Sequence, residues 1–215
     1  MKKYILYFCV LFLLVTQSAW AADHYASPTG SASWANSTNI STPCSLATVW
    51  SSATAGSTIY FREGTYEWNT RVTPSGSGSV GNPIVCTRYG TESVIWKANS
   101  TDELEAIRLD HPYWTFSYMT WNHARTEDMN SPGDKAFLKL GEESPASHVT
   151  VDHITATGCA GGGDNYGIIH AKSSSDYLTV TNCYFSSAYS GVSDNTTCII
   201  IFNFQNFIYM LPEIY

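Results

Sequence analysis

The stretch that decides the fold, residues 113–121, reads YWTFSYMTW, and it returns twice along the chain. The second copy is HVTVDHITA at residues 148–156, and the third is YLTVTNCYF at residues 177–185. In each copy, two short alternating runs flank one polar residue, which is Tyr118, His153 or Asn182. Because side chains along a strand alternate between two faces, every copy predicts a strand, a bend and a second strand.

A second set of short segments repeats between these copies. Residues 107–109 (IRL), 138–140 (LKL) and 169–171 (IHA) lie 31 residues apart, and residues 200–202 (IIF) fall 31 further on. We expect the middle residue of each triplet to face outward and its two neighbours to face inward. Strands that return at a fixed interval of about 30 residues are typical of a solenoid whose coils stack. The fold class predicted is therefore all-β, a parallel β-helix; a β-sandwich is the alternative, but it does not predict fixed columns of matching residues.

Composition excludes several other classes of protein. The chain has 215 residues, of which only 13% are charged and 14% are aromatic. A disordered chain is rich in charge and poor in aromatic residues, and a coiled coil needs abundant Glu, Lys, Arg and Leu. The net charge of −7 argues against nucleic acid as a partner, because phosphate binding needs a basic face.

The beginning of the chain predicts export. Lys2 and Lys3 precede an apolar run at residues 4–15, and a small-x-small cleavage pattern ends at Ala21. We interpret residues 1–21 as a secretory signal peptide. A membrane anchor is the alternative, but the apolar run is shorter than the ~20 residues that span a bilayer. The protein is then secreted or periplasmic, with no membrane span after signal removal, and the Met-Lys-Lys start is typical of bacteria.

The rest of the chain divides into a cap and the coils. Residues 22–57 form an N-terminal segment whose apolar positions between Ser45 and Ala53 have helical spacing, which predicts a short helix covering the first coil. Residues 58–215 form coils of about 30 residues. The last coil is incomplete at Tyr215, so we expect a truncated protein; a natural cap is the alternative. The protein is expected to be a monomer unless a partner covers this open end.

Three short stretches resemble a known family. YASPTGS at residues 25–31, AGSTIYFREGTY at residues 55–66 and GNPI at residues 81–84 are similar to secreted right-handed parallel β-helix proteins of the pectate-lyase-like superfamily. Ser57 stands where that family usually has Asp. The resemblance implies a right-handed β-helix, and it implies a lyase or hydrolase acting on pectin, alginate or a related polysaccharide. Other members have no known reaction.

One column of residues suits the chemistry of such a lyase. A polyuronate lyase removes the proton next to a carboxylate, so it needs a base and a cation that stabilises the developing negative charge. The triplet spacing places Arg108, Lys139 and His170 in one outward column, and the resemblance implies that Lys, Arg or His is the base. These are the candidate catalytic residues, with Lys139 or His170 as the base. Three solvated side chains at permissive positions are the alternative, and the column breaks at Ile201.

Further candidates follow from residue type. Lys172, Trp68 and Trp96 are the candidate substrate-binding residues, because exposed tryptophans stack on sugar rings. The family resemblance also implies calcium as a cofactor, and carboxylates are its usual ligands. Asp152 and Asp164 are the candidate metal ligands, with an ordinary surface or turn role as the alternative.

Two functions remain open. The first is a secreted enzyme for an acidic polysaccharide, a polyuronate lyase of the pectate or alginate type, here an incomplete one. The second is a non-catalytic carbohydrate-binding or cell-surface β-helix module. Cys44 and Cys86 are also candidates for a disulfide between the cap and the first coils.

Overall fold

The computed structural model describes residues 22–99, 105–123, 135–157, 166–172, 175–186 and 199–201. The predicted signal peptide lies outside these residues. In chain order the elements are β1 (Asp23–Ala26), η1 (Trp34–Asn36), α2 (Leu46–Ser52), β2 (Thr58–Phe61), β3 (Gly64–Trp68), β4 (Ile84–Arg88), β5 (Val94–Ala98), β6 (Ile107–Leu109), β7 (Trp114–His123), β8 (Lys135–Leu140), β9 (Thr150–Thr157), β10 (Tyr166–Ala171), β11 (Thr179–Thr181), β12 (Tyr184–Ser186) and β13 (Ile199–Ile201).

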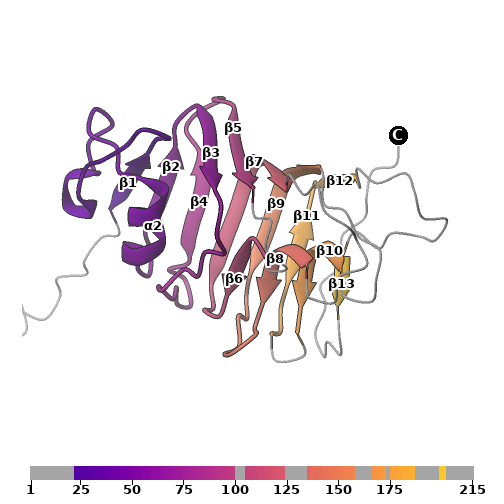
Figure 1. The fold of residues 1–215 in the computed structure, drawn as a ribbon. Helices are drawn as coiled ribbons and strands as arrows, with labels where there is room; N and C mark the ends of the chain where they lie inside the picture. Colours follow the sequence, from indigo (N-terminus) through magenta and orange to yellow (C-terminus); the bar gives the residue numbers. More distant parts are fainter. Residues whose placement is uncertain are drawn as a thin grey trace, which may run out of the picture.

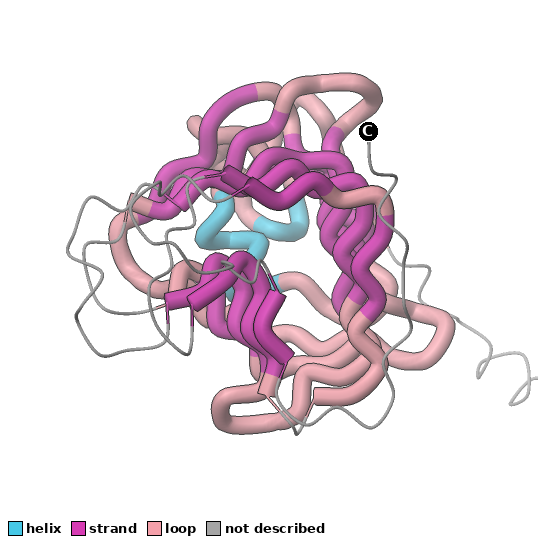
Figure 2. Tube along the Cα trace, turned by 90° about the vertical axis from the view of Figure 1, so that its right-hand side faces the viewer, coloured by secondary structure: helices cyan, strands magenta, loops and turns pink. Residues whose placement is uncertain are grey.

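These strands stack in parallel along three walls, as seen from the side in Figure 1 and along the stack in Figure 2. The first wall contains β1, β2, β4, the first halves of β7 and β9, and β11. The second contains β3, β5, the second halves of β7 and β9, and β12. The third contains β6, β8, β10 and β13. The fold is a right-handed parallel β-helix, which confirms the fold prediction and excludes the sandwich.

The predicted bend separates the first and second walls. Tyr118, His153 and Asn182 all have positive φ, at 55°, 50° and 51°. Non-glycine residues adopt this left-handed conformation rarely, and here it turns the chain by a corner in a single residue. The three residues stand in register, so these three coils turn at the same place.

A second left-handed column, which the sequence pattern did not predict, precedes the first wall. Tyr113, His148 and Tyr177 have φ of 60°, 58° and 60°. Their rings stack, with centroids 4.5 Å apart between Tyr113 and His148 and 4.4 Å apart between His148 and Tyr177. Flat side chains at equivalent positions of successive coils lie close to the ~4.8 Å strand spacing, so the stacking follows from the solenoid itself.

The core fills the space between the walls and ends in the predicted cap. Trp96, Trp114 and Trp121 are fully buried among aliphatic and aromatic neighbours. Helix α2 begins where the Ser45 side chain accepts a hydrogen bond from the backbone N–H of Thr48 at 3.2 Å. The helix buries Trp50 edge-on against Trp96, with ring centroids 5.1 Å apart. No helix among the described residues has the length and apolar character needed to cross a membrane.

Two sequence predictions are wrong in detail. Ile200, not Ile201, stands opposite His170, so the last interval is one residue shorter than the 31 between the earlier triplets. Residues 199–201 are all isoleucine, and a uniform run has no alternation that could reveal its register. Cys44 and Cys86 are both buried and unbonded, so they do not join the cap to the coils. Cys86 lies on an inward position of β4 and serves as a core residue.

Candidate functional site

The candidate catalytic column lies on the third wall. Arg108 of β6 is in register with Lys139 of β8, and Lys139 is in register with His170 of β10, as the triplet spacing predicts. Lys139 and His170 are nevertheless only 3% and 2% exposed. The alternative that the column consists of solvated side chains is therefore wrong for these two residues. Strand alternation fixes the direction of a side chain away from the core, but it does not determine what covers that side chain.

Arg108 is held by two carboxylates. Its Nε lies 3.1 Å from an Asp110 oxygen, and its Nη2 lies 3.0 Å from a Glu143 oxygen. The other Asp110 oxygen accepts a hydrogen bond of 2.9 Å from the backbone N–H of Glu143. Asp110 thus fixes both the guanidinium and the loop that follows β8.

Lys139 and Lys172 share one carboxylate. Glu142 Oε2 lies 2.6 Å from Lys139 Nζ and 2.5 Å from Lys172 Nζ. Gly141, with φ of 74°, makes this geometry possible, because it turns the chain back immediately after β8. Glu142 therefore returns over the strand from which Lys139 projects.

The two ammonium groups control the ionisation of Glu142. Burial alone would raise the pKa of this carboxyl group, but the hydrogen bonds and charges of Lys139 and Lys172 outweigh burial and lower the pKa to about 2. Glu142 is consequently anionic at any pH at which the protein is expected to work. Its negative charge bridges two coils.

A further ion pair lies on the side of the network nearer the cap. Arg71 Nη1 lies 3.3 Å from Oε1 of Glu105, which is almost fully buried. Next to it, the Trp68 indole N–H donates to the Ala106 carbonyl at 3.3 Å, and its ring packs edge-on against Phe137. Trp68 is half-buried and anchored. Trp96 is fully buried in the core, so the expectation that its ring stacks on a sugar is wrong for this conformation.

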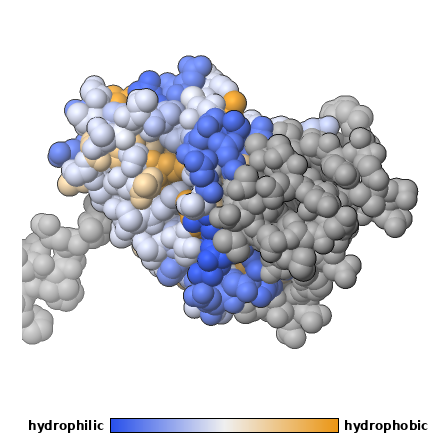
Figure 3. Space-filling model, in the orientation of Figure 1, coloured by the Kyte–Doolittle hydropathy of each residue, from blue (hydrophilic) through white to orange (hydrophobic). Residues whose placement is uncertain are grey.

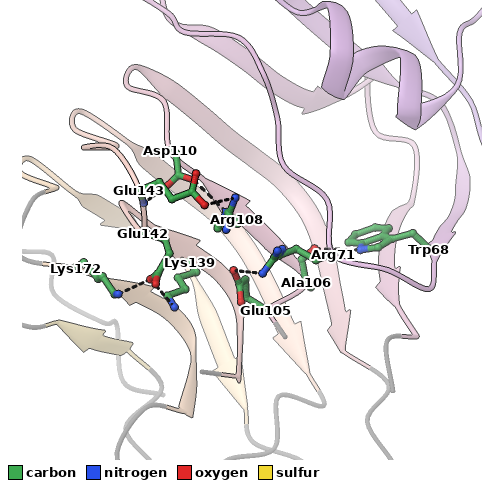
Figure 4. Close-up of polar contacts among 10 residues, drawn as sticks. All are labelled: Trp68, Arg71, Glu105, Ala106, Arg108, Asp110, Lys139, Glu142, Glu143 and Lys172. Atoms are coloured by element: carbon green, nitrogen blue, oxygen red, sulfur yellow. Dashed lines mark hydrogen bonds and ion pairs between the residues drawn. The ribbon is translucent and has the colours of Figure 1, made fainter. Parts of the chain in front are cut away.

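Cations and carboxylates balance on this wall, as Figure 4 shows. Hydrophilic surface gathers over the region of β6 in the orientation of Figure 1 (Figure 3). A carboxylate arriving here would have to compete with Glu142 or Glu143 for the cations. The members of this charged network are Arg71, Arg108, Lys139 and Lys172 on the basic side and Glu105, Asp110, Glu142 and Glu143 on the acidic side.

Asp152, one of the predicted calcium ligands, is already bonded to neighbouring side chains. On the first wall, Asp152 Oδ1 accepts hydrogen bonds from Thr181 at 2.5 Å and from Asn182 at 3.0 Å, and Oδ2 lies 2.9 Å from His153 Nδ1. Burial tends to raise the pKa of Asp152, but these donors lower it overall. Calcium takes six to eight oxygen ligands, whereas hydrogen-bond donors surround this carboxylate.

The described part of the chain shows no calcium site. It contains no group of three or more His, Cys, Asp or Glu side chains placed to hold a metal. Asp164, the other predicted ligand, lies outside the described residues.

Sequence reasoning missed five of the eight members of the charged network, which are Arg71 and the four carboxylates. Glu142 follows Lys139 by three residues and Glu105 precedes Arg108 by three, so the acidic flanks of the basic column were visible in the sequence. The partnership of Arg71 with Glu105 was not visible, because it depends on how the chain between them folds. Adjacent Glu142 and Glu143 contact different cations, so they do not form the facing pair that a hydrolase needs.

Known proteins resemble parts of this chain in sequence and in fold. A scan against protein-family models finds none that matches. The chain is 41% identical over 96 residues to pectate lyase PEL9 of Emericella nidulans, an alignment that covers 44% of this chain and 22% of that protein. The solved structure of pectate lyase Pel9A is similar at a TM-score of 0.43 and 14% identity, over 75% of this chain and 47% of that one. The chain thus spans about a fifth of the length of the curated protein it matches, and it is a parallel β-helix with partial sequence similarity to a pectate lyase.

Proposed function

We propose that this chain is a secreted, polysaccharide-active β-helix protein whose third wall binds a polyuronate and cleaves it by β-elimination. The observation that carries the proposal is the 41% identity over 96 residues to a protein described as a pectate lyase. The charged network supports it, because each of its two lysines and two arginines is already paired with a carboxylate. A polyuronate carries the same group, which such cations bind through charge-assisted hydrogen bonds.

The residues of the network have distinct roles in this proposal. Lys172 is more than a third exposed and Arg108 is partly exposed, so these two are placed to meet a uronate carboxylate at the surface. Lys139 is the base in the proposed elimination, and displacement of Glu142 by the substrate would free it. The incoming carboxylate then takes the place of Glu142 beside the Lys172 ammonium. Lys139, having released its own proton to solvent, accepts as a neutral amine the proton next to that carboxylate, while the glycosidic oxygen leaves with the neighbouring sugar.

The test is an elimination assay on two polymers. The protein is incubated with pectate and with alginate, each with added calcium and with a chelator. Elimination leaves a conjugated double bond that raises ultraviolet absorbance. We expect absorbance to rise with at least one polymer, and the chelator tests the calcium dependence that the family resemblance implies.

Single variants assign the site. Lys139→Ala, Arg108→Ala and His170→Ala are each expected to lower the rate at least tenfold. Lys97→Ala is the matched control, because Lys97 also pairs with a carboxylate, Glu67 at 3.0 Å, but lies on the second wall. If a signal survives all three substitutions unchanged, the third wall is not the catalytic site.

The second candidate function is a non-catalytic sugar-binding module. The burial of Lys139 and His170 favours it, since a general base must reach its substrate. Retention of the protein on immobilised polymer, without any rise in absorbance, would support this alternative.

A further inference from the structure

A groove of about 420 Å³ lies on the outside of the corner between the first and second walls. The charged network belongs to the third wall, and Figure 2 shows the three walls as separate faces of the stack. The groove runs across the coils containing β4, β7, β9 and β12, which follow one another in Figure 1. None of the residues singled out as a catalytic or sugar-binding candidate lines it.

One wall of the groove is a stack of flat polar side chains at the bend. The Arg88 guanidinium lies over the Tyr118 ring, with its central carbon 5.2 Å from the ring centroid. On the other face of the column, the His153 ring stacks on Tyr118 at 4.4 Å and an interplanar angle of 18°. Asn182 continues the column in the next coil, where it donates to Asp152. The stack therefore turns edges that carry hydrogen-bonding groups toward the groove.

The floor of the groove is a column of outward positions on the second wall. Thr120 is in register with Thr155, and Thr155 is in register with Tyr184. The residues on either side of Thr120 and Thr155 are buried, so alternation turns these hydroxyls outward. Tyr184 is 66% exposed, the most exposed aromatic side chain among the described residues. A hydroxyl-lined floor that ends in an exposed aromatic ring suits a sugar, which has one apolar ring face and many hydroxyl groups.

The charge of the groove indicates the kind of sugar. The Glu92 carboxylate at its edge is paired with Arg62 at 2.9 Å, and Asp152 is satisfied by three donors. Arg88 forms no ion pair with any acidic side chain of the described residues, and its visible contact is the neutral ring of Tyr118. The groove thus offers one uncompensated guanidinium, which is the side chain that binds carboxylates most specifically.

We propose that this groove is a second, non-catalytic binding site for an acidic oligosaccharide. A sugar ring packs on Tyr184, Thr120 and Thr155 contact its hydroxyl groups, and Arg88 binds a uronate carboxylate at the other end. The choice of a uronic acid polymer rests on the proposed function. A site here would hold the polymer on the protein while another segment of it reaches the third wall.

Binding of oligogalacturonate, measured by calorimetry in the presence of a chelator, tests the proposal. Tyr184→Ala and Arg88→Gln are each expected to weaken binding about tenfold, whereas Tyr184→Phe keeps wild-type affinity. Tyr177→Ala is the matched control, because Tyr177 is a partly exposed tyrosine outside the groove. On a methyl-esterified oligomer, Arg88→Gln should have no effect, whereas Tyr184→Ala should still weaken binding. Circular dichroism verifies that each variant is folded.

The outcomes separate this inference from the proposed function. The proposed binding site in the groove is overturned if Tyr184→Ala and Arg88→Gln both keep wild-type affinity. It is also overturned if the wild-type protein binds no oligomer. If the wild-type protein binds the oligomer through the groove but shows no elimination, the binding site in the groove is supported and the proposed lyase activity is refuted. If Lys139→Ala abolishes binding and the groove variants do not, the third wall is the binding site and the groove is not.

Discussion

Removal of the Glu142 charge tests the charged network most directly. In Glu142→Gln the side chain keeps its size but no longer carries the negative charge that Lys139 and Lys172 share. Because Lys139 is buried, the loss places two positive groups close together without the anion between them. We expect the variant to be less stable at neutral pH and the difference to disappear in acid.

The pKa of Glu142 sets the size of the effect. The pKa falls from 4.5 to about 2, which corresponds to roughly 3 kcal/mol at about 1.4 kcal/mol per pH unit. The side chain is 29% exposed, so solvent screening reduces this to about 2 kcal/mol. A carboxyl group with a lowered pKa stabilises the fold above its unfolded pKa and loses that contribution as pH falls toward the folded pKa. The window is therefore about pH 4.5 to about 2.

Urea unfolding at pH 7 and pH 3 measures both predictions. At pH 7 the unfolding free energy of Glu142→Gln should lie about 2 kcal/mol below wild type, and at pH 3 the gap should be less than half as large. Glu143→Gln is the matched control. Its side chain is 68% exposed, so its loss should cost at most about 0.5 kcal/mol. A gap that is absent at pH 7, or equally large at both pH values, would refute the assignment of Glu142 as the shared anion.

Two further predictions concern the cap and the core. Ser45→Ala removes the acceptor for the Thr48 N–H and should lower the unfolding free energy by about 1 kcal/mol, measured by denaturant titration against Ser51→Ala on the exposed side of the same helix. Trp96→Ala leaves a cavity at a fully buried position and should lower the unfolding free energy by about 3–5 kcal/mol. Val80→Ala, at an exposed loop position, is the control and should leave the unfolding free energy almost unchanged. A small loss of unfolding free energy for Trp96→Ala would mean that the core rearranges to fill the cavity.

The sequence predicted the fold well because a solenoid repeats its own constraints. The same pattern of Thr115, Thr150 and Thr179 recurs, and the structure pairs these three in register. An alternation of apolar and polar residues that recurs in three coils is much stronger evidence for a strand than one that occurs once. The prediction failed at the last triplet, where three consecutive isoleucines offer no alternation to fix the register.

The site was harder to predict, for a physical reason. Spacing along the chain establishes that Lys139 points away from the core, but its burial depends on the loops that return across the wall. Glu142 reaches Lys139 only because Gly141 turns the chain in the left-handed conformation. Likewise, the groove arises where two walls meet at a corner, and Arg88 lies outside the repeated segments that revealed the coils.

The contrast between the walls is itself an argument for function. A buried ion pair is a poor source of stability, because desolvation of the charges offsets most of their attraction. The first and second walls place threonine at many outward positions, and they stack equally well. Stability therefore does not require the third wall to concentrate eight charged side chains, several of them almost fully buried. Charges present in spite of that cost support the proposal that a ligand exchanges with them, because a polymer of carboxylates could replace Glu142 or Glu143 without leaving the surface cations unpaired.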